Sequence, residues 1–189
     1  MQDVFLNGLT ALAAPPVPVV MGLTLRPFSL GHSVLLEAID SPFVIGGGVS
    51  LSDLSLSAWI CSKTYEAASV ALLSGDQEKP FKKWGHKWAK RGDFSKELEM
   101  FRVYIRHYSK APEQWQTESK PSAIPWQWHL LNALSGGVAD PQLHSRILNM
   151  PINAAVCQYA AIASAGGDKS LMTEEEINGI AELERIANV

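Results

Sequence analysis

The chain has few cysteines, and neither lies near a metal-binding side chain. Its two cysteines, Cys61 and Cys157, are far apart in the sequence, with no CxxC pair and no neighbouring histidine. Both sit in apolar helical patterns, which favours buried free thiols over a disulfide and fits a reducing compartment. Apolar neighbours also favour an inert thiol of high pKa, so a cysteine nucleophile is a weak alternative.

Metal, phosphate and catalytic motifs are absent as well. None of the five histidines is paired with another at i and i+4, and HExxH does not occur, so no metal is expected. The Gly46–Gly48 triplet lacks the GxGxxG or GxxxxGK[ST] context of a phosphate loop. The acidic run Glu174–Glu176 is better explained as helix-start charge than as catalytic carboxylates. The sequence therefore predicts no catalytic residues, no cofactor and no enzymatic activity.

Long hydrophobic runs are also missing. No stretch approaches the roughly 18 apolar residues of a membrane span. The N-terminus is apolar, but Asp3 stands where a signal peptide needs positive charge, and Pro15, Pro16 and Pro18 split the apolar run. We expect a cytoplasmic protein that does not associate with membranes.

What is present is the composition of an ordinary globular domain. The chain has 189 residues, a formal net charge of -3 and 47% hydrophobic residues. A domain of this length buries roughly 70% of its extended surface, enough for a core. The patterns predict an all-α fold, a compact bundle of about eight short helices in a single domain over residues 25–189. Residues 1–24 are expected to form an extended Pro-rich arm and residues 111–125 an exposed loop, and no alternating strand is evident.

The stretch from Leu25 to Leu73 has the densest apolar pattern and is the expected centre of the fold. Its first helix should end before Pro42 and be followed by a flexible turn at Gly46–Gly48. The apolar face of that helix is predicted to hold Leu30, Val34, Leu35 and Ala38, with Leu36 and Ile39 widening it. Helix starts are predicted at Ser29, Ser50 or Ser52, Thr64, Asp93 or Ser95, Pro125, Asp140 and Thr173.

A basic segment with interleaved aromatics is the strongest local anomaly. Residues 79–110 carry ten of the chain's sixteen basic residues against three acidic ones. Its side chains have the chemistry to grip phosphates and stack on bases, or to bind a protein. The alternative is that Phe81, Trp84 and Trp88, at helical spacing, form a buried face and the lysines a solvated one. The candidate interface residues in this segment are Lys82, Lys83, Trp84, Lys87, Trp88, Lys90 and Arg91.

Tryptophans near the polar loop are further candidates for contact residues. Trp115, Trp126 and Trp128 lie in or beside this loop, where a partly exposed aromatic often marks a protein contact, and Trp115 and Trp128 are the candidate interface residues. Filling of the core is the default interpretation for Trp59, Trp84 and Trp126.

Three patches together resemble a viral protein family. They are Leu25–His32 (LRPFSLGH), Leu54–Ser62 (LSLSAWICS) and Met150–Ala155 (MPINAA) followed by an Ala-rich helix. The chain is similar in these patches to the tail-assembly chaperone-like proteins of tailed bacteriophages, which are encoded near the tape-measure gene. The resemblance implies a small helical, non-enzymatic protein in the host cytoplasm that binds the tape-measure protein and helps tail-tube subunits assemble.

Two other interpretations stay open on the residues alone. One is a structural component of the virion, in the tail or the head–tail connection, and the other is a nucleic-acid-binding module that uses residues 79–91. A homo-oligomer is compatible with each of them.

Overall fold

The computed structural model describes residues 18–75, 81, 84, 85, 88, 92–109 and 125–165. Over these residues the protein is mostly helical, with eight helices and one small sheet, so the predicted helical fold class is confirmed. The helices are α2 (Leu30–Ala38), α3 (Pro42–Ile45), α4 (Leu51–Cys61), α5 (Tyr65–Ser74), α7 (Phe94–Tyr108), α8 (Trp126–Leu134), α9 (Pro141–Leu148) and α10 (Ile152–Ala165). The predicted loop, apart from Pro125, and the helix predicted from Thr173 lie outside the described residues.

Most helices begin where a local capping residue stands in the sequence. Each of these side chains accepts a hydrogen bond from a backbone N–H in the first turn, which contributes about 1 kcal/mol to helix stability. The capping residues are Ser29, Ser50, Thr64, Asp93 and Asp140, all at predicted positions. Pro125 differs, because it lies just before α8 rather than inside its first turn.

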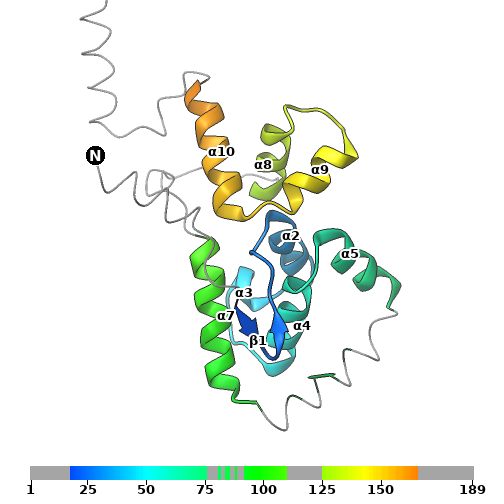
Figure 1. The fold of residues 1–189 in the computed structure, drawn as a ribbon, viewed down its shortest axis with the longest axis vertical. Coiled ribbons are helices and arrows are strands. Elements are labelled where there is room, and N and C mark those ends of the chain that lie inside the picture. Colours follow the sequence, from blue (N-terminus) through cyan, green and yellow to red (C-terminus); the bar gives the residue numbers. More distant parts are fainter. Residues whose placement is uncertain are drawn as a thin grey trace, which may run out of the picture.

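Helix α2 occupies the centre of the fold. It contacts α3, α4 and α5 on one side and α8 and α9 on the other (Figure 1). Because it is packed from several directions, Gly31, His32 and Ser33 are buried along with its leucines. The predicted single apolar face is therefore partly wrong, since Val34 is half-buried and Ala38 is exposed.

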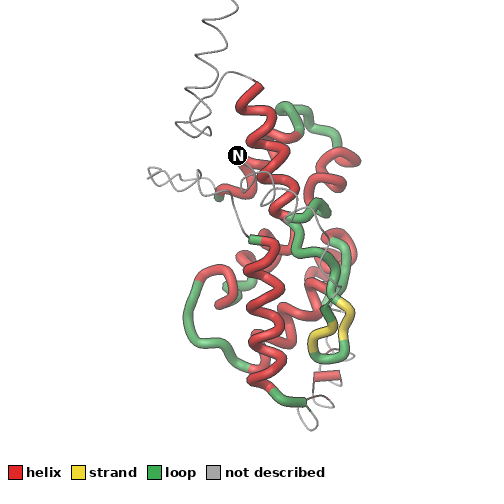
Figure 2. The backbone as a smooth tube through the Cα atoms, turned by 60° about the vertical axis from the view of Figure 1, so that its left-hand side comes forward, coloured by secondary structure: helices red, strands yellow, loops and turns green. Residues whose placement is uncertain are grey.

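A short antiparallel hairpin precedes α2, where the sequence indicated no strand. Strands β1 (Val19–Val20) and β2 (Leu23–Thr24) pair across a turn at Met21–Gly22, whose φ angles are both positive (Figure 2). Such turns match the twist of paired strands. Val20 and Met21 are buried, and the Met21 N–H donates to a Glu97 carboxylate oxygen of α7 at 2.5 Å. Residues 18–24 of the expected arm thus pack on the domain, while residues 1–17 lie outside the described ones.

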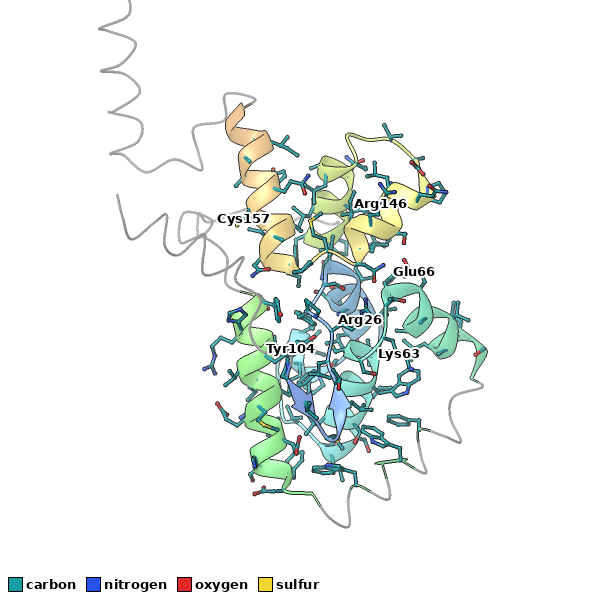
Figure 3. The ribbon with its side chains drawn as sticks, in the orientation of Figure 1. Arg26, Lys63, Glu66, Tyr104, Arg146 and Cys157 are labelled. Carbon is teal, nitrogen blue, oxygen red and sulfur yellow. The ribbon has the colours of Figure 1, made fainter. Side chains whose placement is uncertain are left out.

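Aromatic side chains fill the space between α7 and the centre. The buried face of α7 consists of Phe101, Tyr104 and Tyr108. The Tyr104 hydroxyl donates a hydrogen bond to the Arg26 carbonyl oxygen at 2.7 Å (Figure 3). Phe43 packs edge-to-face on Phe101, with ring centroids 4.6 Å apart. Phe43 belongs to α3, a short helix that the sequence patterns did not predict. Pro42 was interpreted only as the end of the preceding helix, but proline also suits the first position of a new one.

The group α8–α10 is joined to the rest by backbone hydrogen bonds near the start of α2. The N–H groups of Leu30 and Ile152 donate to the carbonyl oxygens of Met150 and Phe28 respectively. At the N-terminus of α5, the Glu66 carboxylate accepts from the Asn149 side chain, facing α9 (Figure 3). These bonds are directional, so they fix how α8–α10 sits on the centre.

None of the helices in the part of the chain that is described is both long and apolar enough to cross a membrane.

Candidate protein-binding surface

A hollow opens on the outer side of α8, where the chain turns back into α9. Its volume is about 250 Å³, and its walls come from α8, the connecting turn and the first half of α9. The lining residues are Trp128, Leu131, Asn132, Ser135, Gly137, Val138, Ala139 and His144. Trp128 and Val138 remain 45% and 57% exposed, so large apolar groups stand at the rim of the hollow.

Gly136 and Gly137 bring the two helices together in this way. Both have positive φ angles, 61° and 73°, which glycine adopts without a Cβ penalty. Because the chain reverses over these two residues, Val138 and His144 return to the side of α8 that carries Trp128. The predicted helix end at this glycine pair is confirmed.

The backbone N–H groups of the connecting turn are already engaged within the protein. The N–H groups of residues 135–138 all donate to carbonyl oxygens of this segment. Among the side chains, Ser135 Oγ donates to the Asn132 carbonyl oxygen and His144 Nε2 donates to the Val138 carbonyl oxygen. What the hollow offers an occupant is therefore mainly apolar contact.

Helix α8 is held in place by a polar contact with α2. The buried Gln127 donates from its Nε2 to Ser33 Oγ at 3.1 Å and to a Glu37 carboxylate oxygen at 2.6 Å. With Gln127 turned inward, Trp126 and Trp128 fall about 100° to either side of it around the helix. Both are nearly half exposed, so the expectation that Trp126 fills the core is wrong.

The stretch of chain that supplies all the walls of the hollow carries few charges. In the stretch 125–165 only Asp140 and Arg146 are charged, whereas the overall 19% of charged residues would give about eight in that length. Trp126 on α8 and Ile162 on α10 are further large apolar side chains of this stretch that are exposed, each at 46%. Charge depletion together with exposed tryptophan is the compositional signature of the core of a protein–protein interface.

The tryptophans of the basic segment lie elsewhere and pack inward. Trp84 and Trp88 are half-buried against the core, and Trp59, Phe81 and Trp84 form a chain of ring contacts. This arrangement favours the alternative in which the aromatics are a packed face rather than a stacking platform for bases. The remaining candidates, Lys82, Lys83, Lys87, Lys90, Arg91 and Trp115, lie outside the described residues.

The two cysteine thiols differ in their burial. Burial raises the pKa of the Cys61 thiol to about 12, so this thiol is protonated at neutral pH. Cys157 is also free but only half-buried, so burial was predicted correctly for Cys61 and only in part for Cys157. Over the residues that the structure places, no group of three or more His, Cys, Asp or Glu side chains is arranged to hold a metal ion.

His32 is the most enclosed of the histidines that the structure describes, and it connects two parts of the core. Its Nε2 lies 2.8 Å from the Lys63 carbonyl oxygen, and its Nδ1 accepts from the Ser29 N–H at 3.1 Å. Because a carbonyl oxygen only accepts, the hydrogen is on Nε2 and the ring is neutral. Burial lowers the pKa of His32, the bond to Lys63 partly opposes this, and the positive charge of Arg26 lowers it further.

The comparisons give no relative to which this surface can be related. No protein-family model, no curated protein and no solved structure matches the chain.

Sequence reasoning identified one residue of the hollow, Trp128, and missed its opposite wall. Val138, Ala139 and His144 carry no motif and become neighbours of Trp128 only through the glycine turn. The scarcity of charge between residues 125 and 165 is a sequence signal that could have indicated this surface.

Proposed function

We propose that this chain is a non-enzymatic factor that binds another protein through the surface formed by α8, the 135–140 turn and α9. The observation that carries the proposal is the Trp128 hollow, whose walls come from a stretch of chain with few charged residues. Tryptophans in such settings dominate the energetics of many protein interfaces. A surface of this kind gains little from binding an ionic ligand and much from covering its apolar groups.

We propose further that the bound protein belongs to a phage tail, either the tape-measure protein or a tail-tube subunit. This step is supported by the three sequence patches and the mostly helical fold. A tape-measure protein is a long amphipathic chain, and a helical factor can cover its apolar stripe by helix-in-groove packing. Binding by several copies along the stripe would add avidity.

The test is co-expression of a tagged chain with the tape-measure and tail-tube proteins encoded beside it, followed by affinity capture and mass determination. We expect a soluble complex, weakened by about 2 kcal/mol in binding free energy, or roughly 30-fold in Kd, by Trp128→Ala. Val103→Asp is the control, because Val103 is similarly exposed at 52% but lies on α7.

Two results would change the conclusion. Failure to capture either protein, together with this chain in purified particles, would favour a structural virion component. Capture that Trp128→Ala and Val103→Asp affect equally would remove the α8–α9 surface from the function.

A further inference from the structure

The size of the Trp128 hollow limits what it can hold. Pockets that enclose cofactors or drug-sized ligands measure roughly 300–1,000 Å³ and bury most of the ligand. At about 250 Å³ the hollow falls below that range, and it is open to solvent, with Trp128 and Val138 of its lining largely exposed. It therefore suits one side chain projecting from a larger molecule better than a free small molecule.

The chemistry of the walls favours an uncharged, mainly apolar side chain. Leu131, Val138 and Ala139 contribute aliphatic surface and Trp128 a broad ring, while the neutral amide of Asn132 is a polar but uncharged part of the lining. Ser135 and His144 already direct hydrogen bonds to backbone carbonyl oxygens. Burying a charged side chain here would remove its hydration without supplying a partner, which is costly.

The backbone around the hollow selects the conformation of the occupant. A peptide that binds as an extended strand needs free backbone donors and acceptors on the receptor. The N–H groups of residues 135–138 are all bonded internally, and α8 and α9 satisfy their own backbones. A helix carries its backbone hydrogen bonds within itself, so it can dock on such a surface without leaving any unmade.

We propose that the Trp128 hollow receives a single aliphatic side chain, of the size of leucine, from an amphipathic helix of the partner protein. This inference rests on the proposed protein-binding function and names the element that the partner supplies. Specificity then comes from the shape of the hollow and the exclusion of charge, so binding should depend only weakly on salt.

The direct test uses an alanine-rich helical peptide of about 20 residues, long enough to be helical in water. The peptide carries one central leucine and i, i+4 Glu–Lys pairs on its opposite face. Binding is followed by the indole N–H resonance of Trp128, which is identified by its loss in Trp128→Phe. We expect a saturable shift with the leucine peptide and at least tenfold weaker binding when the leucine is replaced by aspartate.

Ala139→Phe provides a variant that fills the hollow without removing any contact. It should abolish the peptide-induced shift while the Trp128 resonance remains visible, whereas Val103→Asp should leave the shift unchanged. Equal shifts with the leucine and aspartate peptides, or a shift that survives Ala139→Phe, would overturn the inference.

The same variant separates this inference from the proposed function. A complex with tail proteins that forms equally well with Ala139→Phe would keep the function and exclude the hollow from it. Leucine-selective peptide binding without any tail-protein complex would support the hollow and contradict the proposed partner.

Discussion

Replacement of Gly31 by alanine tests the central packing of the fold. Gly31 lies in α2 and faces Tyr65 of α5 and Leu148 of α9. A Cβ at this position would lie 2.6 Å from Tyr65 Cδ2 and 2.8 Å from both Tyr65 Cβ and the Leu148 carbonyl oxygen. Carbon atoms in contact prefer separations of about 3.5–4.0 Å, so the Cβ cannot be accommodated without movement.

The expected magnitude is the difference between two opposing effects. Alanine stabilises a helix interior by about 1 kcal/mol relative to glycine. Overpacking a core by one methyl group typically costs about 1–3 kcal/mol, and here one of the atoms in the way belongs to the backbone of α9. Because Leu148 can move only with its helix, we take the upper end of the range. The net expectation is a loss of about 2 kcal/mol in the free energy of unfolding.

Gly85→Ala is the matched control. Gly85 also has helical backbone, but an added Cβ would meet nothing within 4 Å. It should therefore stabilise the protein by about 1 kcal/mol, the opposite sign. Urea unfolding followed by circular dichroism at 222 nm measures both variants. A Gly31→Ala protein as stable as the wild type would refute the close approach of α2, α5 and α9.

Two predictions concern titratable groups in the core. Burial lowers the pKa of His32 from its usual 6.5, so the unfolded chain takes up the proton first. The stability contributed by neutral His32 is therefore complete above about pH 6.5 and is lost as the pH falls below it, by at most about 1.4 kcal/mol per pH unit. Urea unfolding at pH 7.5 and 5.5 should show a smaller loss for His32→Gln than for the wild type, and equal losses would contradict the neutral ring. For the thiols, iodoacetamide at pH 8 should modify Cys157 at least tenfold faster than the buried Cys61 in the native protein. In urea, where the protein is unfolded, both thiols should be modified, and mass spectrometry measures the extent of modification at each cysteine.

Helix boundaries were predictable because capping is local. Ser29 caps α2 through the N–H of His32, three residues away, and the same spacing recurs at Ser50 and Asp53. The burial of α2 on nearly all sides was not predictable in this way. It depends on residues such as Gln127, which meets Ser33 across 94 residues of sequence.

The candidate site was predictable only in part for the same reason. Trp128 is a predicted contact residue because it is an aromatic beside a polar loop, and its exposure on α8 is what a contact residue requires. The partial burial of Trp84 and Trp88 follows from their helical spacing, which had supplied the alternative interpretation. The other wall of the hollow depends on the reversal of the chain at Gly136–Gly137. Hydrophobic periodicity along the sequence does not show which residues such a turn brings next to Trp128.

The contacts of α2 with α8 also have a consequence for the order of events during synthesis. Ser33 leaves the ribosome 94 residues before its partner Gln127. At translation rates of about 5–20 residues per second, that interval lasts about 5 to 19 s. During this time the side of α2 that faces α8 has no native neighbour. The central helix of the fold therefore stays partly uncovered in the nascent chain until synthesis has passed α8.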